Sequence, residues 1–379
     1  MLQFKEKDHS VLVLKYLCLC GELPYRSLYL LPANEITLKR TVLKLKKEQY
    51  VTVVGHGDYK TIRLTKKSFP IIKNIYPELL DYYLSITDNH HFRGGSSNGN
   101  DIGKRFVWRR HRIAEALCMF SQLNVELLPF EKGTLHSTSK ISGVIEPDER
   151  VFYSSIEVKN VDPEQKYKTD FTRMLGVYFS PGGVYPVYNT NKRLMKWNRQ
   201  GELKAKILVE DIASSNHFSY LKRLIKIDNA ILFGEDYDML LRILRENGES
   251  SSNFEFLSFD NVFTNIYYVL LNSNGKKQIE IMSHENWQET IASAVLGPSR
   301  NPPFNIDCDD FNDNKYTLLF LDGNIGRLNR FKQGKDLNSN SKFEIVCYPD
   351  QVDFMIDFFN NDIEISTVSL DSVLSLFEK

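Results

Sequence analysis

Residues 34–49 combine a narrow apolar stripe with a high density of positive charge. The apolar positions are Leu38, Val42 and Leu45. Their spacing of i, i+4 and i+7 predicts one buried face of an amphipathic helix, which starts after Asn34, a favourable N-cap, and ends near Gln49. The cations on the remaining faces are Lys39, Arg40, Lys44, Lys46 and Lys47.

Shorter elements are expected on both sides of this helix. Residues 10–20 are a compact apolar run that ends at Gly21, and residues 23–31 predict a short second helix with Pro24 in its first turn. The hairpin strands are residues 50–54 and 59–65, around the turn Gly55–Asp58. Two helices, a basic third helix and a hairpin with a glycine-rich tip form the element order of a winged helix-turn-helix.

In that fold the third helix enters the major groove and the wing reaches the adjacent backbone. We therefore expect residues 1–73 to bind DNA, and the alternative is a winged helix that binds protein. Arg40 and Lys44 are the expected groove contacts. The expected phosphate contacts are Lys39, Lys46, Lys47, Lys60 and Arg63.

The charge distribution favours the DNA-binding interpretation. The 379-residue chain has a net charge of zero, yet residues 1–73 hold 14 Lys/Arg against 6 Asp/Glu. Residues 305–379 hold 7 Lys/Arg against 14 Asp/Glu. A basic segment favours polyanions through counterion release, and an acidic segment does not. The expected DNA-binding part is therefore the basic head.

The sequence predicts a multidomain protein of α+β or α/β class. The expected parts are a winged helix-turn-helix at 1–73, a connector and link at 74–103, an α/β domain at 104–297 and an α/β segment at 298–379. The connector is helical over 69–87, and the glycine-rich stretch 93–103 is flexible. A basic cluster at 104–112 precedes a helix at 113–123. The Pro-rich loop 298–314 is the candidate break between the last two parts.

Strands and helices alternate after residue 140, which predicts sheets covered by helices. The expected strands are residues 142–146, 151–158, 184–188, 230–233, 254–259, 317–321, 343–347 and 363–367. The expected helices are residues 166–179, 237–246, 287–295 and 352–359.

One segment of the α/β domain matches a nuclease motif. Asp148 lies at the end of one expected strand, and Glu157 and Lys159 lie on the next. A strand would place Glu157 and Lys159 on one face, because side chains repeat every two residues. Asp148 and Glu157 would then hold Mg²⁺, and Lys159 would activate the attacking water, as in PD-(D/E)xK enzymes of restriction-endonuclease-like fold.

Two other interpretations of this segment stay open: an exposed hairpin in which Glu157 and Lys159 pair, and a nuclease-like fold without activity. Mg²⁺ is the one cofactor that the nuclease hypothesis implies. The turn Asp322–Arg327, at a strand-to-helix junction, is either a tight turn or a phosphate site made by backbone N–H groups. A phosphate site there would fit a transcriptional repressor that senses a small ligand.

The cysteines and the apolar runs exclude further classes of protein. Five cysteines without a paired spacing disfavour a disulfide framework or a zinc site. No apolar run approaches the roughly 20 residues of a membrane span, and the start of the chain lacks the apolar segment of a signal peptide. We therefore expect a cytoplasmic protein without a membrane partner.

Four stretches together resemble one known family. They are Leu38–Lys47 of the basic helix, Ile62–Lys67 at the wing exit, Glu157–Lys159, and the strand, helix and strand at 343–373. In this combination the chain resembles the replication-relaxation proteins of Gram-positive plasmids and conjugative elements. The resemblance is one of pattern and spans most of the chain. It implies a role in plasmid replication and in DNA relaxation or transfer.

The leading hypothesis is thus sequence-specific binding of double-stranded DNA in the replication or transfer of a plasmid or mobile element. The α/β region would be an assembly module for a relaxase, a replication protein or a second copy of the chain in a homodimer. The first alternative is the metal-dependent nuclease, and the second is the ligand-responsive repressor.

Overall fold

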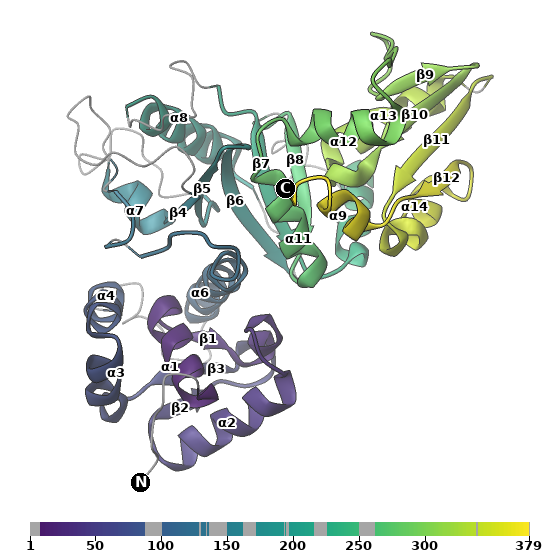
Figure 1. Cartoon of the computed structure of the whole chain (residues 1–379). Coiled ribbons are helices and arrows are strands. Elements are labelled where there is room, and N and C mark those ends of the chain that lie inside the picture. Colours follow the sequence, from purple (N-terminus) through teal and green to yellow (C-terminus); the bar gives the residue numbers. More distant parts are fainter. Residues whose placement is uncertain are drawn as a thin grey trace. The chain divides into compact units, whose positions relative to one another are not determined.

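The computed structural model describes residues 8–87, 101–128, 130–133, 135, 150–161, 172–192, 194, 197–215, 226–249, 262–338 and 340–378. Side chains are described for all of these except residues 87, 101–105 and 246–249. The chain is mixed α/β, with three β-sheets among the described residues, and forms two compact units, Met1–Gly133 and Thr134–Lys379 (Figure 1). None of the helices in the described ranges combines the length and the apolarity that crossing a lipid bilayer requires.

The first unit is mostly helical, with one small sheet. Its helices are α1 (His9–Cys20), α2 (Glu35–Lys47), α3 (Phe69–Ile75), α4 (Pro77–Thr87) and α6 (Asp101–Phe120), with the 3-10 helices η1 (Tyr25–Leu30), η2 (Gly57–Tyr59) and η3 (Lys66–Ser68). Its strands are β1 (Leu23–Pro24), β2 (Val51–Val54) and β3 (Thr61–Leu64). They form an antiparallel sheet in the order β1-β3-β2.

Local signals set the bounds of α1 and α2. Gly21 follows α1 with a φ of 76°, a conformation that glycine adopts without strain. Asn34 caps α2, because its side chain accepts hydrogen bonds from Ile36 N (3.0 Å) and Thr37 N (3.3 Å). The predicted helix at 10–20, the predicted basic helix and the predicted hairpin are confirmed.

The second helix predicted over residues 23–31 is wrong in its first part. Leu23 and Pro24 form the short strand β1, and Leu23 pairs with Ile62 of β3. Helical structure begins only at Tyr25. Pro24 has an extended ψ of 128°, and at the edge of a sheet its missing N–H removes no hydrogen bond from the ladder.

The connector is helical, as predicted, but it consists of two helices. The break falls at Tyr76, which has an extended φ of −140° and a ψ of 73°. Tyr76 precedes Pro77, and the ring of a proline disfavours helical geometry at the residue before it.

Helix α6 belongs to the first unit, where it packs on α1 and β1. The assignment of residues from 104 onward to the α/β domain is therefore corrected. The helix also starts at Asp101, earlier than the predicted 113. Most of the predicted link at 93–103 lies outside the described residues.

A buried carboxylate, Glu22, joins α6 to the small sheet. Arg110 Nε of α6 donates to Glu22 Oε1 (2.8 Å), and Arg63 Nε of β3 donates to Glu22 Oε2 (2.7 Å). The Glu22 side chain is completely buried, and that of Arg110 is 4% exposed. Because removing one partner would leave a buried charge uncompensated, these ion pairs hold α6 against the sheet.

A second carboxylate of α6, Glu115, accepts hydrogen bonds from Ser27 Oγ (2.6 Å) and Arg26 Nη2 (3.1 Å), next to η1. His111 of the same helix is completely buried, and neither ring nitrogen has a hydrogen-bond partner within the described part of the chain. Burial, assisted by the charges of Arg26 and Arg110, lowers the pKa of His111 to about 3. The folded unit therefore holds this histidine neutral.

The second unit contains two sheets. The five-stranded sheet has the order β4-β5-β6-β7-β8, with β4 (Val151–Ser154), β5 (Gly176–Ser180), β6 (Gly183–Asn191), β7 (Asn229–Gly234) and β8 (Asn265–Leu270). The four-stranded sheet has the order β12-β11-β10-β9, with β9 (Asp310–Asn312), β10 (Lys315–Leu319), β11 (Lys342–Cys347) and β12 (Glu364–Thr367). The helices are α7 (Ser155–Asn160), α8 (Arg199–Ser215), α9 (Tyr237–Glu249), α11 (Ser273–Met282), α12 (Trp287–Leu296), α13 (Ile325–Leu337), α14 (Val352–Phe359) and α15 (Leu370–Leu374), with η5 (Phe320–Asp322) and η6 (Pro349–Gln351).

The directions in which neighbouring strands pair agree with the lengths of the connections between them. Neighbouring strands are antiparallel from β4 to β6 and parallel from β6 to β8. Strands β10, β11 and β12 are parallel, and β9 pairs antiparallel at the edge. Parallel neighbours require long crossovers, and these contain α8 and α9 in the first sheet and α13 and α14 in the second.

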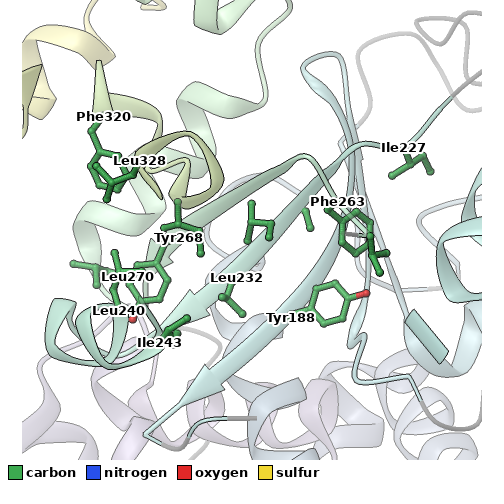
Figure 2. Packing of buried hydrophobic residues seen from close by; sticks show 14 of the residues in the cluster. Tyr188, Ile227, Leu232, Leu240, Ile243, Phe263, Tyr268, Leu270, Phe320 and Leu328 are labelled. Atoms are coloured by element: carbon green, nitrogen blue, oxygen red, sulfur yellow. The ribbon is translucent and has the colours of Figure 1, made fainter. Parts of the chain in front are cut away.

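Both sheets contribute to one apolar core. Leu232 of β7 and Tyr268 of β8 belong to the same core as Phe320 and Leu328, which follow β10 (Figure 2). A buried carboxylate, Glu202 of α8, borders this core. It accepts hydrogen bonds from Thr172 Oγ1 (2.6 Å), Arg173 N (2.7 Å) and the Tyr188 hydroxyl (2.9 Å), and burial raises its pKa.

Most predicted elements of the second unit are confirmed, with small shifts of their ends. They are the strands at 184–188, 230–233, 317–321, 343–347 and 363–367 and the helices at 237–246, 287–295 and 352–359. The strand predicted over 151–158 is wrong after Ser154, where α7 begins. The helix predicted over 166–179 is wrong at its end, because residues 176–179 belong to β5. The strands predicted at 142–146 and 254–259 lie outside the described residues.

Replacing Glu22 with Gln should lower the free energy of unfolding of the first unit by about 3 kcal/mol, because Arg110 would lose its buried counter-charge. The matched control is Glu35→Gln, which breaks an exposed pair with Lys39 and should cost under about 0.5 kcal/mol. Urea unfolding followed by circular dichroism measures both. Equal effects of the two variants would contradict a structural role for Glu22.

The stability of the first unit should fall as the pH drops below about 6.5. The unfolded chain then protonates His111, whereas the folded unit resists protonation down to about pH 3. The contribution is therefore complete at neutral pH and decreases by about 1.4 kcal/mol per pH unit below 6.5. Urea unfolding at pH 7, 6 and 5 should show a shallower pH dependence for His111→Gln. A variant of the exposed His56, His56→Gln, should keep the wild-type dependence.

Candidate nucleic-acid interface

Helix α2 has one face that holds it to the first unit and one face that points to solvent (Figure 1). The side chains of Leu38, Val42 and Leu45 are completely buried, which confirms the predicted stripe. The residues opposite this stripe are Ile36, Arg40, Leu43 and Lys47, at i, i+4, i+7 and i+11. All four are exposed. The burial of the stripe therefore fixes which residues of α2 are available to a partner.

Four of the seven predicted DNA contacts are exposed cations of α2, namely Arg40, Lys44, Lys46 and Lys47. Lys39 differs from them, because its Nζ lies 2.6 Å from Glu35 Oε1. The hydrogen bond to Glu35 raises the pKa of Lys39 and compensates part of its charge locally. The C-terminal turn of α2, with Lys44, Lys46 and Lys47, is therefore its most positive part.

The other two predicted contacts face the unit itself. Lys60 Nζ lies 3.8 Å from the centroid of the Tyr25 ring, and Arg63 is held by Glu22. The structure therefore does not bring Lys60 and Arg63 onto the exposed face of α2. Arg110, from the basic cluster at 104–112, is likewise used internally, in its pair with Glu22.

Two further cations border α2 and were not among the predicted contacts. Lys66 and Lys67 follow β3 and are exposed. Lys67 Nζ donates to the carbonyl oxygen of Glu48 (2.9 Å), the C-cap residue that follows α2, and lies 5.0 Å from the centroid of the Tyr50 ring. We call the exposed cations of this region the α2 surface; they are Arg40, Lys44, Lys46, Lys47, Lys66 and Lys67.

The hairpin tip between β2 and β3 depends on two glycines with positive φ, Gly55 at 80° and Gly57 at 54°. A Cβ atom on Gly55 would lie 2.3 Å from the carbonyl oxygen of Tyr59, so only glycine fits there. The exposed tip residues are His56, Gly57 and Asp58. The tip thus has no Lys or Arg, and the positive charge concentrates on α2 and η3.

The nuclease motif loses its geometric basis, since Glu157 and Lys159 lie on helix α7 and not on a strand. Ser154 and Glu157 form a capping box, in which Glu157 Oε2 accepts from Ser154 N (2.7 Å) and Ser154 Oγ accepts from Glu157 N (3.4 Å). Residues two apart on a helix do not share a face. Asp148 lies outside the described residues. Within those that are described, no three His, Cys, Asp or Glu side chains gather as a metal site would require.

The turn Asp322–Arg327 is built into the second unit. Its Gly323 carbonyl accepts from Tyr268 N of β8 (2.8 Å), and the Asn324 side chain caps α13 by accepting from Arg327 N (3.3 Å). Burial raises the pKa of Asp322 to about 6, against the opposing charge of Arg327. The Asn324 side chain therefore already binds one of the N–H groups that a phosphate at this helix N-terminus would use.

A cavity of about 500 Å³ lies between the end of α13 and the starts of β11 and β12. Its charged lining residues are Lys335, Asp336, Lys342, Asp362 and Glu364. Lys335 and Asp362 form an ion pair with each other. The lining of this cavity thus carries charges of both signs.

Comparison with models of protein families, with curated proteins and with solved structures finds no match for this chain.

Proposed function

We propose that the chain binds double-stranded DNA through its first unit, with α2 in the major groove. The order α1, β1, η1, α2, β2 and β3, together with the sheet order β1-β3-β2, supports assigning this unit to the winged helix-turn-helix class. In that class α2 is the recognition helix and the β2–β3 hairpin is the wing.

The observation that carries the proposal is the exposed face of α2. A 13-residue helix presents four exposed cations while its apolar stripe is fully buried. An α-helix with side chains is about 10–12 Å across, and the major groove is about 12 Å wide. The helix therefore fits the groove, and its flanking cations meet the phosphates on either side.

Within this proposal, the position of each cation on α2 determines whether it contacts a base or a phosphate. Arg40, on the central line of the exposed face, reads a base edge, and guanine is the base that an Arg fork matches best. Lys44 lies beside this line and supports the groove contact. Lys46 and Lys47 near the end of α2 contact phosphates, and these contacts orient the protein without reading sequence.

The second unit is proposed to be the assembly module of a plasmid or mobile-element protein. The acidic excess of residues 305–379 supports this role, because an acidic surface is repelled by DNA and is available to a protein partner. A relaxase, a replication protein or a second copy of the chain is the partner that the replication-relaxation resemblance implies.

Arg40→Ala combined with Lys44→Ala should weaken binding to a preferred duplex at least about tenfold, because both groove contacts are lost. Gel-shift titration of the full chain against a duplex selected from a random pool measures the loss. The matched control is Lys226→Ala with Lys342→Ala, which removes two exposed cations of the second unit. Equal affinity of the two double variants would refute α2 as the recognition helix.

Lys46→Ala combined with Lys47→Ala should weaken all duplexes to a similar extent and lower the salt dependence. Each phosphate contact contributes about −0.9 to the slope of log affinity against log salt concentration, so the slope should become shallower by about two. Fluorescence anisotropy at several salt concentrations measures the slope. An unchanged slope would show that these two lysines do not contact phosphate.

A further inference from the structure

Two large apolar side chains stand on the exposed face of α2, among its cations. Ile36 is 61% exposed and Leu43 is 59% exposed. The buried stripe of α2 is formed by other residues, so neither side chain fills the core of the first unit. Both side chains therefore remain in water in the folded unit, where a partner of this face would cover them.

The two side chains lie in one line with Arg40, at i, i+4 and i+7 of α2. A rise of about 1.5 Å per residue separates Ile36 from Leu43 by about 10 Å. This distance corresponds to roughly three base-pair steps of 3.4 Å. Ile36 is also the second residue of α2, and the N-terminal part of a recognition helix is the part that reaches base edges.

The major groove has one apolar feature that such side chains match. It is the C5-methyl group of thymine, while guanine presents the two acceptors that an Arg fork binds. The sequence of side chains along α2, apolar, Arg, apolar, is therefore complementary to two thymines with a guanine between them.

We propose that Ile36 and Leu43 recognise the methyl groups of two thymines about three base pairs apart, flanking a guanine contacted by Arg40. This inference rests on the proposed function and adds to it the chemical class of the preferred site. The surrounding charge selects DNA over the same face of a second copy as the occupant. Two α2 surfaces, each with six exposed cations at its centre and border, would repel one another.

The test uses thymine replacement in a duplex that the full chain selects from a random pool. Each thymine in turn is replaced by deoxyuridine, which removes only the methyl group. At two positions the replacement should weaken binding about fourfold, the equivalent of about 0.8 kcal/mol for one buried methyl group. Ile36→Ala should abolish the effect at one of these positions, and Leu43→Ala at the other.

The matched control is Leu337→Ala, which removes an apolar side chain that is 84% exposed in the second unit. This variant should keep both uracil effects. Because Ile36 and Leu43 are exposed, their replacement by Ala should leave thermal melting unchanged, so a lost uracil effect reports on recognition and not on folding.

Three outcomes would overturn the inference. If the duplex with every thymine replaced bound with full affinity and unchanged salt dependence, methyl recognition would be refuted and the proposed DNA binding would stand. Failure of the full chain to select or bind any duplex would remove the proposed function itself. A change in sedimentation behaviour for Ile36→Ala, without any uracil effect, would assign the apolar pair to a contact between copies.

Discussion

The buried carboxylate of Glu22 is the interaction on which the architecture of the first unit depends. It binds Arg110 of α6 and Arg63 of β3, so that one residue just after α1 connects a helix far along the chain to the small sheet. In this scaffold, α2 packs against the rest of the unit through its buried apolar stripe. The exposed face of α2 is consequently available for recognition, and the rest of the unit supplies its rigidity.

Local patterns predicted the elements whose signals are contained in a few neighbouring residues. Gly21 and Asn34 mark helix ends by their own chemistry, and the α2 stripe follows the helical period. Strand β1 has only two residues, too few for a period, and its conformation depends on pairing with β3. Helix α6 is held by ion pairs to residues about ninety positions away, Glu22 and Arg26, which no local window contains. The start of α7 was readable, because Ser154 and Glu157 have capping-box spacing, but the surrounding β-branched and aromatic residues favoured a strand.

At the candidate interface, the sequence predicts the charge of each residue but not the direction in which its side chain points. The sequence located the positive charge correctly on α2, since Arg40, Lys44, Lys46 and Lys47 are exposed. It could not separate these residues from Lys60 and Arg63, whose directions are set by Tyr25 and Glu22. Ile36 and Leu43 were visible as apolar residues off the buried stripe. Only the structure shows that the buried stripe is complete without Ile36 and Leu43, which leaves both side chains on the exposed face.

The separation of the two faces of α2 has a consequence for the substitutions that this helix tolerates. Ile36, Arg40, Leu43 and Lys47 are exposed, so exchanging them alters little of the packing that keeps the unit folded. Surface substitutions of this kind usually change stability by less than about 0.5 kcal/mol. Under the proposed function, substitution of Ile36, Arg40 and Leu43 would therefore change the preferred DNA sequence while the fold of the unit is kept. Selection on stability would meanwhile act on Leu38, Val42, Leu45 and the Glu22 ion pairs.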